Sequence, residues 1–131
     1  MVKISKGLKI LLLINAIMGL IFAFFYLAIS NIYLSLIQWP FYDPYHSWLF
    51  GGILLIISIF TLLAIKRTEW KEIRIIFELI IALQLMTLIL NVMALILIPA
   101  PVMSLITTWI NNFLLIILIV ANIYFYTKQE I

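Results

Sequence analysis

The stretch Lys66-Arg67-Thr68-Glu69-Trp70-Lys71-Glu72-Ile73-Arg74 decides the fold of this chain. It stands near the middle of the 131 residues and contains four of the eight basic residues. Strongly apolar sequence, mostly Ile, Leu, Phe, Met, Val and Ala, extends on both sides of it over residues 8–126. We therefore interpret the stretch as a charged turn at one membrane face, which joins two transmembrane hairpins of two helices each.

The composition excludes a water-soluble domain. Hydrophobic residues make up 67% of the chain, charged residues only 10%, and the mean hydropathy is +1.30. Ordinary soluble domains contain about 25% charged residues, which cover their surface. The sequence therefore predicts an all-α integral membrane protein, a four-helix transmembrane bundle that forms a single domain over residues 1–131.

The positions of the basic residues predict the orientation. Three precede the first apolar run, four lie in the central stretch and one lies in the tail, whereas the connections 39–43 and 99–104 contain none. Lys and Arg are enriched in cytoplasmic loops. We therefore expect both termini and the central turn in the cytoplasm (N-in/C-in), in the cytoplasmic membrane of a prokaryote. The eight residues are Lys3, Lys6, Lys9, Lys66, Arg67, Lys71, Arg74 and Lys128.

Proline and capping residues set the expected helix boundaries. Asp43 followed by Pro44 is typical of an N-cap and a first helical position. Thr68 is the expected cap of the third helix, and Pro99 stops that helix. The predicted helices cover about residues 8–38, 44–66, 69–98 and 102–126.

The first predicted helix is longer than a membrane requires. About 31 residues at 1.5 Å each span roughly 46 Å, against a hydrocarbon core of about 30 Å. Its last part contains a polar stripe of Asn31, Ser35 and Gln38. We expect this part to leave the core, as a tilted extension or as a short helix in the interface.

Small residues mark faces for close helix packing. They gather on the first helix at Ala16, Gly19 and Ala23, and on the second at Gly51 and Ser58. Small residues let the backbones of membrane helices approach closely. From these faces we predict a homo-oligomer, a dimer or trimer, with the first helix at the contact.

The clearest polar stripe is on the third helix, where Gln84, Thr87 and Asn91 follow the spacing i, i+3, i+7. Lipid cannot satisfy an amide, so the stripe should face other helices. Two interpretations remain open. The stripe either forms interhelical hydrogen bonds, or lines a hydrated path or a lipid pocket.

Three asparagines on other helices extend this set of ligand or pathway candidates. Asn111 and Asn122 are eleven residues apart, which returns them to nearly the same face of the fourth helix. Asn15 on the first helix is expected at the same depth as Asn122. A network that joins Asn15, Asn122 and Gln84 is one arrangement, although the sequence does not show which helices touch.

Glu78 is the one carboxylate within an apolar run, one helical turn beyond Arg74. We expect the two residues to form an ion pair at the inner membrane boundary. A proton-coupled transporter would place its carboxylate nearer the middle of the membrane.

Asp43 and His46 form a polar cluster on the outer face, next to Ser47. A hydrolytic triad needs Ser and His side chains that converge, but adjacent helical residues point about 100° apart. We therefore assign no catalytic residue, and helix capping explains Asp43. With one His and no Cys, no metal site and no cofactor are expected.

The order of features resembles the small four-helix DoxX-like membrane proteins, many of them uncharacterised. The matching features are residues 15–19, the Trp39-Pro40 and Asp43-Pro44 turn, Gly51-Gly52, and the charged stretch at mid-chain. The first helix lacks the arginine that such families often contain, so no functional residue is transferred. The resemblance implies the fold and an accessory role beside other membrane proteins.

We therefore predict a non-enzymatic membrane protein that associates with itself or acts as an accessory or scaffold subunit for lipid or a membrane partner. Its alternatives are an oligomeric channel or transporter for a small solute or ion, and a lipid-modifying enzyme. Anionic headgroups are expected partners of the basic face, at about 1 kcal/mol per Lys or Arg. Nucleic acid is not an expected partner.

Overall fold

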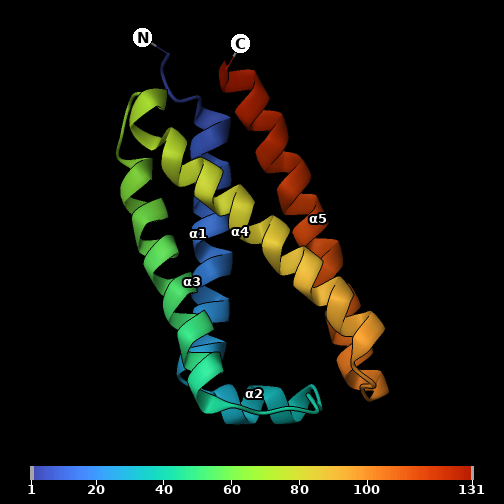
Figure 1. Cartoon of the computed structure of the whole chain (residues 1–131). Coiled ribbons are helices and arrows are strands. Elements are labelled where there is room, and N and C mark those ends of the chain that lie inside the picture. The colour runs from blue at the N-terminus through green and yellow to red at the C-terminus, as the bar shows by residue number, and fades with distance from the viewer. Residues whose placement is uncertain (1, 131) are drawn as a thin grey trace.

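The computed structural model describes residues 2–130, and the described chain is all-helical (Figure 1). Four of its helices are long and apolar enough to cross a membrane, and the short helix α2 is the exception. The helices are α1 (Lys6–Leu27), α2 (Ser30–Leu36), α3 (Pro44–Ile65), α4 (Trp70–Leu97) and α5 (Val102–Glu130).

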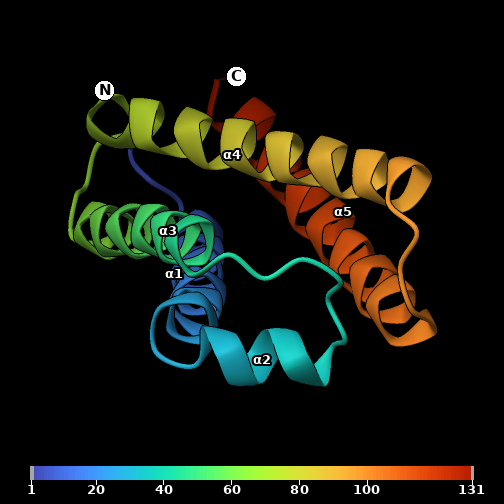
Figure 2. The ribbon, with the colours of Figure 1, turned by 60° about the horizontal axis from the view of Figure 1, so that its bottom comes forward.

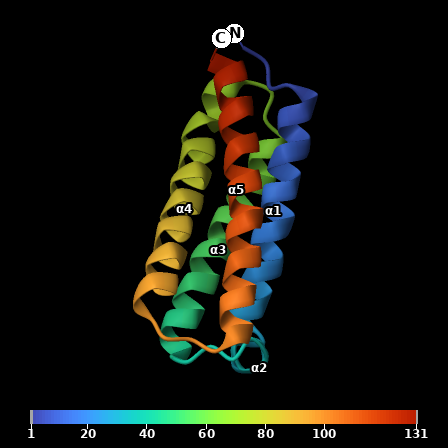
Figure 3. The same cartoon turned by 90° about the vertical axis from the view of Figure 1, so that its right-hand side faces the viewer.

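The helices form two hairpins with common ends. Both termini and the α3–α4 connection lie at one end, which we call the terminal end (Figures 1 and 3). Helix α2 and the α4–α5 connection lie at the opposite end, which we call the α2 end. The four long helices therefore alternate in direction, and the basic stretch joins the α1–α3 hairpin to the α4–α5 hairpin.

The first hairpin packs closely because small residues line the contact between α1 and α3. A Cβ atom added at Gly19 would lie 2.1 Å from the Ser58 hydroxyl oxygen, and one at Gly51 would lie 2.8 Å from Cγ of Leu27. Ala16 is also fully buried. These small residues of the first helix therefore pack within the protomer and do not form a free face for a second copy. Self-association, with the first helix at the contact, remains a prediction.

The main hydrophobic core lies at the terminal end, where the two hairpins meet. Leu8 and Leu12 of α1 pack in one cluster with Ile73 and Phe77 of α4, and all four side chains are fully buried. Trp70 stacks edge-on against Phe77, with ring centroids 5.7 Å apart. From this core, α4 and α5 lean away from the first hairpin toward the α2 end (Figure 1).

The single helix predicted over residues 8–38 is wrong, because the chain breaks after Leu27. Ile29 has φ −129° and ψ 32°, which is not helical, and α2 begins at Ser30. Helix α2 runs across the α2 end rather than along the bundle (Figure 2). This is the short crosswise helix that was one of the two expected arrangements, and it absorbs the length that a membrane does not need.

Two further boundaries differ from those expected. Glu69, not Thr68, is the N-cap of α4 and makes no side-chain capping bond. The N-terminal segment occupies this turn instead, since Ile4 N donates to the Thr68 carbonyl at 2.9 Å and Trp70 N donates to Val2 at 2.9 Å. The last helix continues to Glu130 rather than ending near residue 126.

Candidate functional site

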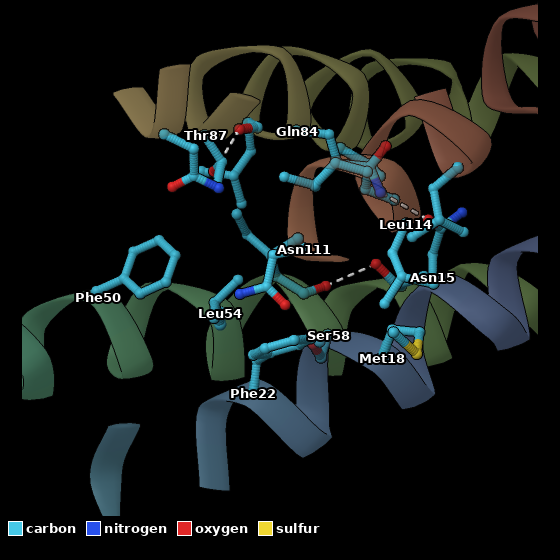
Figure 4. Close-up of a pocket in the computed structure, with 18 residues that line it drawn as sticks. Asn15, Met18, Phe22, Phe50, Leu54, Ser58, Gln84, Thr87, Asn111 and Leu114 are labelled. Carbon is cyan, nitrogen blue, oxygen red and sulfur yellow. Dashed lines mark hydrogen bonds between the residues drawn. The ribbon is translucent and has the colours of Figure 1, made fainter. Parts of the chain in front are cut away.

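A cavity of about 130 Å³ lies between the two hairpins and is lined by residues of α1, α3, α4 and α5 (Figure 4). Both sides of the cavity are mainly apolar, and each contributes polar side chains. Helices α1 and α3 supply one amide and two hydroxyls, whereas α4 and α5 supply three amides and one hydroxyl. The apolar side chains of the first side include Met18, Phe22, Phe50 and Leu54, and the polar side chains of the second side are Gln84, Thr87, Asn91 and Asn111.

A network of three amides closes the end of the cavity nearer the core. Asn15 Nδ2 donates to Asn122 Oδ1 at 2.8 Å, and Gln84 Nε2 donates to Asn15 Oδ1 at 2.8 Å. Asn122 Nδ2 completes the ring by donating to Gln84 Oε1 at 2.7 Å. Asn122 is fully buried, and the remaining Asn15 donor reaches the Leu11 carbonyl at 3.1 Å.

This amide network connects the two hairpins, because Asn15 is on α1 while Gln84 and Asn122 are on α4 and α5. Each of the three amides both donates and accepts within the ring. Buried amides that are satisfied in this way stabilise a specific arrangement of helices. The network of Asn15, Asn122 and Gln84, which the sequence left open as one arrangement, is present and links the hairpins.

The other two residues of the α4 stripe, Thr87 and Asn91, make different kinds of hydrogen bond. Thr87 Oγ1 donates to the Leu83 carbonyl of its own helix at 2.8 Å. Asn91 Nδ2 donates across to Asn112 Oδ1 on α5 at 2.9 Å. Asn112 is buried, and its own Nδ2 has no partner among the described residues. The spacing of eleven residues to Asn122 favoured Asn111 over its neighbour Asn112, so Asn112 was not among the candidates.

A second polar contact joins the hairpins at the α2 end. The Ser104 hydroxyl of α5 lies 2.7 Å from the carbonyl oxygens of both Ile37 and Gln38, which directly follow α2. Gln38 has φ 55°, the left-handed region that a non-glycine residue rarely adopts. The hydroxyl therefore holds a tight turn in place, and the cavity lies between this contact and the amide network.

The ion pair at the terminal end is larger than expected. Arg74 Nε lies 2.9 Å from Glu78 Oε1, as the i, i+4 spacing predicts, and 3.5 Å from Glu130. Tyr126 donates to Glu78 at 2.7 Å, and Trp70 Nε1 donates to Glu130 at 2.7 Å. Glu130 joins because α5 extends beyond its predicted end. Arg74 and Glu78 are about half exposed, which suits a structural pair at a boundary.

Asp43 and His46 form the expected polar pair at the α2 end. His46 Nδ1 lies 2.5 Å from Asp43 Oδ2, and Asp43 Oδ1 caps α3 by accepting from Tyr45 N at 3.0 Å. The hydrogen bond from His46 is the main cause that holds the pKa of the Asp43 carboxyl below its usual range. Both side chains are more than half exposed. The pair lies outside the cavity and accounts for a cap.

Metal chemistry finds no support in the geometry of residues 2–130. Within this range, no group of three or more His, Cys, Asp or Glu side chains is placed to hold a metal ion. The residues around the cavity are amides, hydroxyls and apolar side chains.

Comparisons of the chain with protein-family models, with curated proteins and with solved structures gave no match. The residues and geometry described above therefore carry the functional argument.

Proposed function

We propose that the chain is a non-enzymatic protein of the cytoplasmic membrane that crosses it four times, with both termini inside, as an accessory subunit that contacts lipid or a membrane partner. Four apolar helices of sufficient length support the crossings. The terminal end contains the basic stretch and the N-terminal lysines, and Lys and Arg favour the cytoplasmic side. The resemblance to small DoxX-like proteins points to the same accessory role.

The observation that carries this proposal is the uncharged cavity between the hairpins. All eighteen of its lining residues are uncharged, and most are apolar. Proton relays, ion paths and hydrolytic sites use charged or titratable side chains inside the membrane. A neutral, mostly apolar cavity is instead suited to binding.

One observation favours the second candidate, an oligomeric channel or transporter. Thr87 and Asn91 lie one turn apart on α4 and line the cavity together with Asn111 of α5. A row of this kind can hold a file of water molecules. A solute flux through liposomes that contain the purified protein, abolished by Asn111→Leu, would select this candidate over the accessory role.

Cysteine labelling tests the proposed topology, because the chain contains no native cysteine. Single cysteines at Tyr45 and Ala100 should react with an impermeant reagent added to intact cells. Cysteines at Lys6 and Arg67 should react only after permeabilisation. Labelling at Arg67 in sealed cells would contradict the layout.

Purification in native lipid nanodiscs tests the accessory role. We expect a defined lipid or a membrane protein to co-purify in constant ratio, and native mass measurement will show whether a second copy is present. If the protein is monomeric over a wide dilution range and co-purifies only with bulk lipid, both self-association and a specific membrane partner are contradicted.

A further inference from the structure

We propose that the cavity binds a neutral amphipathic molecule taken from the surrounding membrane, with its uncharged hydroxyl or carbonyl head between Asn91 and Asn111. The inference rests on the proposed function, which places the chain in a membrane. It adds the chemical class of the ligand and the position of its head group.

The charge of the cavity excludes an ionic ligand. All of its lining residues are uncharged, and the ion pair of Arg74 and Glu78 is not part of the lining. A charged head placed among amides and apolar side chains would lose its hydration without gaining a counter-ion. The ligand is therefore neutral.

The mainly apolar lining, with a few amides and hydroxyls, is suited to a ligand with an apolar body and one polar group. Phe22, Phe50 and Leu54 form an apolar surface on the side of the first hairpin (Figure 4). Thr87 and Asn111 face the cavity from the second hairpin. A pure hydrocarbon would offer no hydrogen bond to the amides of Asn91 and Asn111, which line the cavity.

Among the amides that line the cavity, the free hydrogen-bonding capacity lies toward the α2 end. At the other end, Asn15 and Gln84 are committed to the amide network. Among the described residues, Asn91 uses one N–H for Asn112, and its carbonyl oxygen keeps two lone pairs. Asn111 adjoins the Tyr33 hydroxyl of α2, and an amide offers four hydrogen-bonding positions. The head group therefore binds between these two amides.

The size of the cavity limits how much of the ligand enters. Its volume of about 130 Å³ is close to that of an apolar cavity of about 150 Å³ that holds benzene. It accommodates a head and the first few carbons rather than a whole phospholipid. The cavity is partly open to the surroundings, so the rest of a chain can extend outward past lining residues such as Leu114.

Photo-crosslinking tests the proposal on the full chain in zwitterionic nanodiscs. The probe is decan-1-ol with a diazirine on its chain, and crosslinked residues are mapped by mass spectrometry. We expect crosslinks at cavity residues such as Phe22 and Leu54. Unlabelled decan-1-ol should compete, whereas decanoate, which is charged, and decane, which has no head, should compete at least about fivefold less well.

Variants locate the head group. Asn111→Leu should lower cavity crosslinking roughly five- to tenfold, the usual effect of one lost hydrogen bond. Asn31→Leu is the matched control, since Asn31 is exposed on α2 and should leave crosslinking unchanged. Leu54→Trp, which fills the cavity, should abolish crosslinking while helicity is retained, so the test does not depend on the folding of Asn111→Leu.

Three outcomes would overturn the inference. The first is that decane or decanoate competes as well as decan-1-ol does, and the second is that crosslinking stays at the wild-type level in both Asn111→Leu and Leu54→Trp. The third outcome is crosslinks only at exposed positions outside the cavity. These results leave the cysteine-labelling pattern untouched, so failure of the ligand site and failure of the proposed topology are distinguishable.

Discussion

Asn15 of α1 and Asn122 of α5, 107 positions apart in the chain, are joined by a hydrogen bond of 2.8 Å. With Gln84 of α4 they form a closed ring of amides between the two hairpins. In an apolar medium a buried amide without a partner is costly, so each member of the ring depends on the other two. The ring defines how the hairpins are placed on either side of the cavity.

The first prediction concerns this ring. Asn122→Leu should lower the free energy of unfolding by about 1–2 kcal/mol, because it leaves one N–H of Asn15 and the side-chain oxygen of Gln84 without their partner. Reversible unfolding in mixed micelles measures the effect.

The control is a double-mutant cycle between Asn15→Leu and Asn122→Leu. The combined loss should be clearly smaller than the sum of the two single losses, because the second substitution removes a group already left without its partner. Strict additivity would mean that the two side chains do not interact in the membrane.

The second prediction concerns the contact between Gly19 and Ser58. Gly19→Ala should destabilise the protein by about 1–3 kcal/mol, because the new methyl group would overlap the Ser58 hydroxyl oxygen at 2.1 Å. Adding Ser58→Ala should restore stability, since the remaining Ser58 Cβ lies at an ordinary 3.5 Å. Thermal unfolding in detergent measures both variants.

Gly52 provides the matched control on α3, because no atom lies within 4 Å of a Cβ added there. Gly52→Ala should be neutral or stabilising by up to about 1 kcal/mol, from helix propensity. If Gly19→Ala is as harmless as Gly52→Ala, then α1 and α3 do not pack as closely as described.

The third prediction separates a paired position from a lipid-facing one on α4. Asn91→Leu should lower the thermal midpoint more than Leu90→Val, because it removes the hydrogen bond from Asn91 to Asn112. Asn112 would then have no side-chain partner, since its Nδ2 already has none among the described residues. Leu90 is 55% exposed, so the smaller valine costs little. Asn91→Leu combined with Asn112→Leu should recover most of the loss. A silent Asn91→Leu would show that this bond does not hold α4 to α5.

The fourth prediction concerns pH and Asp43. Its folded pKa lies below the ordinary value of 3.8, mainly because of the hydrogen bond from His46, so its charge adds stability above pH 3.8. That contribution falls as the pH drops through the lower folded pKa. Asp43→Asn keeps an N-cap acceptor and removes only the charge. The difference in thermal midpoint between the wild type and Asp43→Asn should be small at pH 7 and should disappear below the folded pKa of Asp43. A difference that does not change with pH would exclude the Asp43 carboxylate as its source.

Several local features were predictable from the sequence. Pro44 and Asp43 marked the start of α3 correctly, and Pro99 marked the end of α4, because proline and capping residues act within one turn of their own position. The i, i+4 spacing likewise predicted the pair of Arg74 and Glu78. The helix break after Leu27 could not be predicted in this way, because the residues around Ile29 contain no proline or glycine.

The sequence by itself determined the number of long apolar helices, their approximate limits and the side on which charge gathers. These properties depend on hydropathy, proline and charge, which are summed along one segment at a time. Only the tertiary structure decided that Gly19 packs against Ser58 inside the protomer, that Asn91 donates a hydrogen bond to Asn112, and that a cavity remains between the hairpins. The physical reason is that apolar residues occur on all sides of each helix, so periodicity separates only a few polar stripes from the rest and does not show which helix each stripe meets. Partners are selected by the fit of side chains from distant segments.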